Sequence, residues 1–158
     1  MRKKKELTAV MNEEKDLLKF LLTIDLFRDL SKLERKNLIK YIYLRQYRKG
    51  EIIFKKGYPN VVMYIVREGR LRVMLSDSDD LEMNILKPKD FFGEIGLFLE
   101  ESRTATVEAQ EDSVLLAISK RDLSTFIARF PRAGVKILYR LGEILSQNLI
   151  KTNQTITH

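Results

Sequence analysis

The spacing of apolar residues changes twice along the chain, and these two changes constrain the fold more than any other feature. Between residues 13 and 48 apolar residues recur at helical spacing. After Gly50 they alternate with polar residues or form short β-branched runs, as strands do. From Ser119 the helical spacing returns. The order of helices, strands and helices predicts an α+β fold with an antiparallel β-barrel at its centre.

The strand-like segments between Gly50 and Ser119 are short and regularly spaced, with turn-forming residues between them. This spacing is typical of a β-sandwich or β-barrel. We expect a polar hairpin tip at residues 76–80. The predicted strands are Ile52–Phe54, Val61–Val66, Leu71–Leu75, Leu81–Ile85, Ala105–Ala109 and Ser113–Ile118.

Capping residues mark the expected helix boundaries. Asn12 is a plausible N-cap for the first helix. Ser31 with Glu34, and Ser119 with Asp122, have the spacing of capping boxes. We expect Pro131 to end the helix that Ser119 begins. The expected apolar faces are Leu33, Leu38, Ile39 and Ile42 in the second helix, and Val135, Leu138, Leu141, Ile144, Leu145 and Leu149 in the last one.

These boundaries divide the chain of 158 residues into one domain with short flanks. That length fits a single domain. The predicted parts are a basic, mobile N-terminus over 1–12, one domain over 13–151 and a tail over 152–158. Within the domain we expect N-terminal helices over 13–48, the barrel over 50–118 and C-terminal helices over 119–151.

The side-chain inventory excludes several classes of chemistry. The chain has no Cys, and its single His is His158 at the very end. Disulfides, thiol nucleophiles, His-based catalysis and multi-His metal sites are therefore not expected. No stretch approaches the roughly 18 apolar residues of a membrane span, and the basic start lacks the apolar run of a signal peptide. We expect a cytoplasmic domain that is not an enzyme and holds no metal or cofactor.

The formal net charge of +7 is concentrated in the first third of the chain, which begins Arg2-Lys3-Lys4-Lys5. Residues 51–110 are slightly acidic instead. A basic excess can mark a contact with nucleic acid or an anionic membrane. A solvated chain end is the interpretation that we favour.

One segment interrupts the strand pattern, and its residues suit a phosphate ester. Gly93 is followed by a short segment compatible with a helical turn, which presents free backbone N–H groups. Arg103 follows just before a new strand and can contact phosphate oxygens. Glu94 can accept a hydrogen bond from a sugar hydroxyl. The alternative is that Glu94 and Arg103 form an ion pair that braces the loop.

These residues belong to a longer pattern. Phe92-Gly93-Glu94-Ile95-Gly96-Leu97 and Arg103-Thr104-Ala105-Thr106-Val107 resemble the phosphate-binding cassette of the cyclic nucleotide-binding domain family. This family includes catabolite activator-type regulators, protein kinase regulatory subunits and cyclic-nucleotide-gated channels. Glycines at 50, 57 and 69 and the run Met63-Tyr64-Ile65-Val66 also match, so the resemblance covers roughly residues 20–150.

The resemblance implies a fold and a ligand site. The fold is a jelly roll, or double-stranded β-helix, flanked by N-terminal helices and C-terminal B and C helices, with a short helix in the cassette. Arg103 would hold the exocyclic phosphate oxygens and Glu94 the ribose 2′-hydroxyl, with the amides of Ile95 and Ala105 as further donors. Ser102 departs from the family, which commonly has Pro there. The implied ligand-binding residues are Gly93, Glu94, Ile95, Gly96, Arg103, Thr104 and Ala105.

The resemblance leaves the base and the output open. A hydroxyl at Thr104 favours cyclic GMP, whereas cyclic AMP is the ligand of most bacterial and kinase relatives. Arg140, Leu141 and Ile144 in the last helix could close over the base. We expect a regulatory module that relays occupancy by movement of that helix, acting on a partner that the sequence does not identify. No helix-turn-helix for DNA is present. The alternative is a scaffold with a non-functional pocket that forms a homodimer through the last helix.

Overall fold

The structure, a computed structural model, describes residues 2–75 and 82–156. It separates into two compact units. The helical unit comprises Met1–Lys40 and Phe126–His158, and the barrel unit comprises Tyr41–Thr125. The prediction of one domain over 13–151 stays a prediction. The expected hairpin tip at 76–80 lies outside the described residues.

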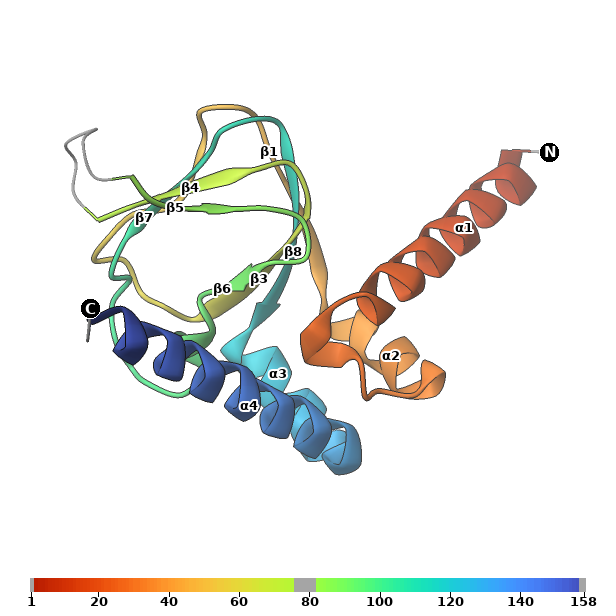
Figure 1. Cartoon of the computed structure of the whole chain (residues 1–158). Helices are drawn as coiled ribbons and strands as arrows, with labels where there is room; N and C mark the ends of the chain where they lie inside the picture. Colours follow the sequence, from red (N-terminus) through yellow and green to blue (C-terminus); the bar gives the residue numbers. More distant parts are fainter. Residues whose placement is uncertain (1, 76–81, 157–158) are drawn as a thin grey trace. The chain divides into compact units, whose positions relative to one another are not determined.

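The barrel unit contains two four-stranded antiparallel sheets, drawn in Figure 1. The strand orders are β1-β8-β3-β6 and β2-β7-β4-β5. The antiparallel jelly-roll prediction is confirmed. The strands are β1 (Tyr43–Tyr47), β2 (Ile52–Phe54), β3 (Val62–Glu68), β4 (Leu71–Met74), β5 (Glu82–Leu86), β6 (Phe91–Phe92), β7 (Thr106–Ala109) and β8 (Ser113–Ser119).

Alternation of side chains along these strands produces the barrel core. In β7 half-buried and buried residues alternate, as expected for a strand with one face inward. The central strand β8 is buried along most of its length because it pairs with β1 on one side and β3 on the other. The core cluster contains Val66, Leu71, Leu86, Phe92, Val107, Ala109 and Leu115.

The strand β1 corrects the prediction of helices over 13–48. Residues 43–47 pair with β8 along their full length, from Tyr43 opposite Ala117 to Tyr47 opposite Ser113. Four of these five residues are exposed, so no strand-like burial pattern marks the segment. Ile42, expected on a helix face, lies between a 3-10 turn and this strand. Pairing with a distant strand has overridden the local helical pattern.

The first helix is longer than its sequence pattern indicates. The helix α1 spans Arg2–Leu22, so Asn12 lies inside it and is not its N-cap. Residues 2–15 are rich in Lys, Glu, Leu, Ala and Met, which favour helix without an apolar face. The basic segment 1–12 is therefore helical from Arg2 onward. The 3-10 helix η1 (Asp25–Phe27) and the helix α2 (Lys32–Leu38) follow.

The capping predictions are largely confirmed. In α2 the Glu34 N–H donates to Ser31 Oγ (3.2 Å) and the Ser31 N–H donates to Glu34 Oε2 (2.8 Å). Ser119 Oγ accepts the Asp122 N–H (3.0 Å) at the start of α3 (Lys120–Arg129), but Asp122 accepts the Ser119 hydroxyl and not its N–H. Leu33, expected on the apolar face of α2, is 67% exposed.

The last helix, α4, spans Pro131–Ile156 and extends beyond the expected end at 151. The helix α3 ends at Arg129, which agrees with the stop predicted from Pro131. Of the expected stripe on α4, Leu141 is buried, whereas Val135 and Leu149 are exposed. α4 contacts η1, and α1 contacts both η1 and α2. Among the described helices, none is long and apolar enough to cross a bilayer.

Candidate functional site

The predicted turn after Gly93 is present. Phe92 of β6 pairs with Tyr64 of β3, and the chain then leaves the sheet at Gly93, which has φ +80°. A short 3-10 helix, η3 (Glu94–Leu97), follows directly. Glycine adopts the left-handed conformation without a Cβ penalty, so the sequence can turn sharply here. The strand, the glycine and the helical turn bring the cassette to the end of β6.

The turn at residues 57–60 fixes the backbone of Arg103 from both sides. The Arg103 N–H donates to the Tyr58 carbonyl (2.8 Å), and the Gly57 N–H donates to the Arg103 carbonyl (2.8 Å). Pro59 and Ser102 form an isolated antiparallel bridge beside them. Gly57, one of the three glycines that match the family pattern, therefore positions the Arg103 main chain. The two halves of the cassette come together although Arg103 is not in a strand.

The Arg103 side chain is buried and only partly satisfied. It is 5% exposed, and its Nη2 donates to the Val62 carbonyl (2.8 Å). Within the described residues, Nε and Nη1 of Arg103 are buried and have no hydrogen-bond partner. Burial lowers the pKa of the guanidinium, because a low-dielectric environment disfavours the charged form. A buried cation with two unused donors is a site for an anion.

The alternative of a bracing Arg103–Glu94 ion pair is wrong for this structure. Among the described residues, Arg103 has no carboxylate within ion-pair distance. Glu94 is half-buried, and burial raises the pKa of its carboxyl although its own N–H donates to it. Within residues 2–75 and 82–156, these two oppositely charged groups of one cassette are thus each left without a charged partner. Both remain available to a ligand.

Gly93 is required by Arg103 as well as by the turn. A Cβ on Gly93 would lie 2.5 Å from Arg103 Nη1 and 2.8 Å from the Val62 carbonyl oxygen. A glycine at this position allows another group to approach the backbone closely. The structure shows that the approaching group is the arginine side chain itself.

A cavity of about 180 Å³ opens beside these groups. Of the predicted ligand-binding residues, Gly93, Glu94, Ile95, Arg103, Thr104 and Ala105 line it. Gly96 is buried and is not part of this lining. Residues that the sequence did not single out for the site complete the lining: Phe54, Asn60, Val73, Leu86, Phe92 and Val107.

Asn60 is the polar residue that sequence reasoning missed. Its main chain and carboxamide pack against Gly96, where a Cβ would overlap them, and its Oδ1 is buried without a partner in the described structure. Asn60 also borders a second groove, of about 480 Å³, on which Gly96 lies. The signal that the sequence offers for this packing is Gly96, a position without a side chain inside the cassette.

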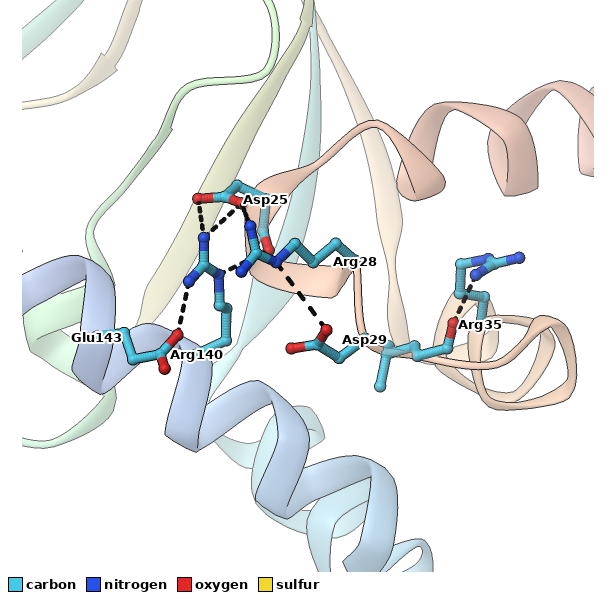
Figure 2. A network of polar contacts seen from close by, with 7 residues as sticks. Asp25, Arg28, Asp29, Arg35, Arg140 and Glu143 are labelled. Carbon is cyan, nitrogen blue, oxygen red and sulfur yellow. Dashed lines mark hydrogen bonds and ion pairs between the residues drawn. The ribbon is translucent and has the colours of Figure 1, made fainter.

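The predicted base contacts lie in α4, outside the lining of the cavity. The Arg140 guanidinium donates to both carboxylate oxygens of Asp25 (2.7 Å each) and to Glu143 (2.6 Å), as Figure 2 shows. These hydrogen bonds raise the pKa of Arg140. Leu141 is buried and Ile144 half-buried. A base contact by these three residues stays a prediction, and for Arg140 it would require breaking the pairs.

No metal centre competes with this site in the part of the chain that the structure describes. There, no group of three or more His, Cys, Asp or Glu side chains could hold a metal ion.

Comparison with known proteins identifies the family that the chain resembles. The family described as "Cyclic nucleotide-binding domain" matches residues 44–130. The "Cyclic AMP receptor protein" of Thermus thermophilus is 30% identical over 78% of this chain and 56% of its own length. The "cGMP-dependent protein kinase" of Toxoplasma gondii is 25% identical over 83% of this chain and 12% of its own length. The chain thus spans about half or less of these curated relatives.

The solved structure of the Thermus thermophilus catabolite activator protein has the same fold. It superposes with a TM-score of 0.74 and 27% identity, over 84% of this chain and 62% of that one. The family match includes β2 to β8 and both halves of the cassette, and extends over more than half of the 158 residues. The chain therefore belongs to the cyclic nucleotide-binding domain family.

Proposed function

We propose that this domain binds cyclic AMP or cyclic GMP in the barrel cavity, with Arg103 holding the cyclic phosphate. The observation that carries the proposal is the pair of buried nitrogens on Arg103 that have no partner among the residues described. An anionic ligand would supply acceptors to both and would compensate the desolvated charge. The printed names of the two relatives, a cyclic AMP receptor and a cyclic GMP-dependent kinase, support the ligand class.

The ribose would meet Glu94. Its carboxylate borders the same cavity as Arg103 and has no cationic partner in the described structure, so it can accept a hydrogen bond from the 2′-hydroxyl. The amides of Ile95 and Ala105 are proposed as further donors. A free anion would need the arginine alone. A ribose phosphate would contact both Arg103 and Glu94, and we therefore favour it over a free anion as the ligand.

The cavity accommodates part of a nucleotide in its present form. Ligand sites usually enclose about 300–1,000 Å³, whereas this cavity has about 180 Å³. We infer that the phosphate and ribose occupy it and that the base projects outward. Thr104 is exposed at the rim, where its hydroxyl can meet the 2-amino group of guanine. Cyclic AMP, which lacks that group, remains the first ligand to test.

Occupancy would be relayed by the C-terminal helix α4. A ligand shifts a conformational equilibrium only by its differential affinity for the two states. Closure of α4 over the base would provide that difference, and Leu141 and Ile144 are the proposed contacts. The regulated output and its partner are not identified by any feature of the chain. The domain itself is a regulatory module, and we propose no reaction for it.

The second candidate is a scaffold with an empty pocket that dimerises through α4. The exposed apolar side chains Val135, Tyr139, Leu149, Ile150 and Ile156 on this helix favour it. Homodimerisation is also compatible with ligand binding, so it discriminates poorly between the two functions. Whether the pocket binds a cyclic nucleotide decides between the two functions.

Calorimetric titration with cyclic AMP and cyclic GMP tests the proposal. We expect saturable binding of one ligand per chain, weakened by about 2–5 kcal/mol in Arg103→Ala, the usual cost of truncating one partner of a buried charged contact. Arg70→Ala, an exposed arginine of the same unit, is the matched control and should bind normally. Absence of heat and of any melting shift at millimolar ligand would favour the scaffold. Release of a linear nucleotide would instead indicate an enzyme.

A further inference from the structure

The Arg103 guanidinium lies on the face of an aromatic ring. Its Cζ is 3.9 Å from the centroid of the Phe54 ring and 5.8 Å from that of Tyr64. A cation within about 6 Å of a ring centroid is attracted by the ring quadrupole, most strongly when it is desolvated. Arg103 is desolvated, being 5% exposed. The sequence assigned Phe54 only to a strand.

Phe54 is part of a three-ring platform formed with Tyr64 and Phe92. The ring centroids are 6.1 Å apart for Phe54–Tyr64, 5.9 Å for Phe54–Phe92 and 5.3 Å for Tyr64–Phe92. Phe54 comes from one sheet, whereas Tyr64 and Phe92 are paired neighbours in the other. The platform therefore joins the two sheets under the cassette.

Further contacts keep the platform in place. Phe54 of β2 lies opposite Val107 of β7. Val107 follows Arg103 by four residues in the chain. Tyr47 forms a side-chain hydrogen bond with Tyr64, and burial together with this phenol raises the pKa of Tyr47 to about 12. Phe54 and Tyr64 both pack against the barrel core. The rings are held by the fold and not by the arginine.

Arg103 has few other favourable contacts. The single hydrogen bond of its guanidinium in the described structure goes to the Val62 carbonyl. Without a further favourable group, an extended arginine would gain by leaving the cavity for water. The Phe54 face supplies that group while leaving the in-plane donors unused, because a ring contacts the flat side of the guanidinium.

We propose that Phe54 is a positioning residue that holds the Arg103 guanidinium in the cavity, oriented for an oxyanion. The expected effect of Phe54 on ligand affinity rests on the proposed function. Its effect on the position of Arg103 can be tested without any ligand. The competing interpretation is that Phe54 only fills the barrel core. In that case, replacing it costs the same stability whatever residue stands at position 103.

A double-mutant cycle on the ligand-free chain separates the two interpretations. Urea unfolding is measured for Phe54→Leu, Arg103→Met and the double variant. We expect Phe54→Leu to raise the unfolding equilibrium constant by about five- to thirtyfold more when Arg103 is present than in the Arg103→Met background. The same cycle with the exposed Arg70→Met should be additive. Equal losses in the two Arg103 backgrounds would overturn the proposal.

A measurement on the unsubstituted chain avoids any loss of folding. A guanidinium stacked on Phe54 should have an Arg103 Hε NMR signal shifted upfield by the ring current, identified by its disappearance in Arg103→Lys. An Hε signal at the ordinary position for arginine would overturn the stacking.

Titration with cyclic AMP then tests the consequence for the ligand. Phe54→Leu should weaken binding about five- to thirtyfold, and Phe54→Tyr, which keeps the ring face, should restore it to within about threefold. Equal affinities of the Leu and Tyr variants would contradict a role in positioning. If the unsubstituted chain binds no cyclic nucleotide, the proposed function fails, while the unfolding cycle and the NMR signal still decide the role of Phe54.

Discussion

Arg140 and Arg103, two of the three buried arginines among the described residues, are used in opposite ways. Arg140 in the helical unit is 7% exposed and donates to Asp25 on η1 and to Glu143 on its own helix (Figure 2). Arg103 in the barrel unit is 5% exposed, and among the described residues its guanidinium makes one hydrogen bond, to the Val62 carbonyl. Similar burial therefore accompanies a satisfied guanidinium at Arg140 and an unsatisfied one at Arg103.

The difference shows what marks a binding site. A buried charge that is fully paired contributes to the arrangement of the fold, here by linking α4 to η1. A buried charge with unused donors is unfavourable in the empty protein and becomes favourable when a ligand completes it. The number of unused donors therefore distinguishes the two roles, and burial alone does not.

The largest effect is expected at Gly93, which supports the unsatisfied arginine. Gly93→Ala places a Cβ 2.5 Å from Arg103 Nη1 at a φ of +80°, so it should cost about 2–5 kcal/mol of unfolding free energy and abolish nucleotide binding. Gly50→Ala is the matched control, because its φ is +87° but nothing lies within 4 Å. Equal losses in urea unfolding of the two variants would show that the contact with Arg103 is unimportant.

The next effect concerns the packing of Asn60 on the cassette. Gly96→Ala should lose about 1–3 kcal/mol by overpacking against Asn60. Adding Asn60→Ala should restore part of that stability, since it removes the carboxamide but not the main-chain carbonyl. Gly142→Ala, with open space around it, should be neutral or stabilising. A stable Gly96→Ala variant in urea unfolding would contradict this packing.

A smaller effect is expected for the paired arginine. Arg140→Met should lower the melting temperature because Glu143 and Asp25 lose the Arg140 cation, although Asp25 keeps its ion pair with Arg28 and both carboxylates are partly exposed. Its affinity for cyclic AMP should stay unchanged. Arg132→Met, exposed on the same helix, is the control for stability. Loss of affinity without loss of stability would assign Arg140 to the base, as the sequence predicted.

The smallest effects are expected at Glu34 and Glu94, which should change the stability of the fold with pH in opposite directions. Burial raises the pKa of Glu34, but hydrogen bonds from Ser31 and Lys136 outweigh it, so that its pKa lies below the ordinary 4.5. Its stabilisation is present above pH 4.5 and is lost as the pH falls through the lowered pKa. For Glu94, burial raises the pKa, so that stability declines as the pH rises from 4.5 through the raised pKa.

Urea unfolding between pH 3 and pH 7 measures the contributions of Glu34 and Glu94 to the free energy of unfolding. At pH 7, Glu34→Gln should be less stable than the unsubstituted chain and Glu94→Gln more stable. Both differences should shrink on acidification, when the carboxyl groups become protonated. A Glu94→Gln variant that is less stable at pH 7 would show that the carboxylate has a favourable partner in the empty site.

Local signals in the sequence predicted much of the fold and the cassette. The pattern around Gly93 indicated both the turn and the anion-binding chemistry, and the Ser31–Glu34 box marked the start of α2. Each of these features depends on residues within a few positions of one another. The antiparallel β-rich middle could likewise be predicted because its strands alternate.

Features that depend on distant partners could not be predicted. The strand β1 is exposed and is recognisable only through its pairing with β8. Arg140 meets Asp25, which is 115 residues away. The roles of Asn60 and Phe54 follow from packing against Gly96 and Arg103, and neither leaves a periodic signal. The sequence thus identified Arg103, which we propose binds the anion, but not the residues that pack against the cassette.

The most direct test of the central claim is the unfolding free energy of Arg103→Met with and without cyclic AMP. Without ligand, the variant should lie within about 1 kcal/mol of the unsubstituted chain, because the guanidinium there has two unused donors. With ligand at about 100 times its Kd, the unsubstituted chain should gain about 2.7 kcal/mol and the variant almost nothing. A large loss without ligand, together with equal gains in both proteins, would contradict the claim that Arg103 is kept for an anion.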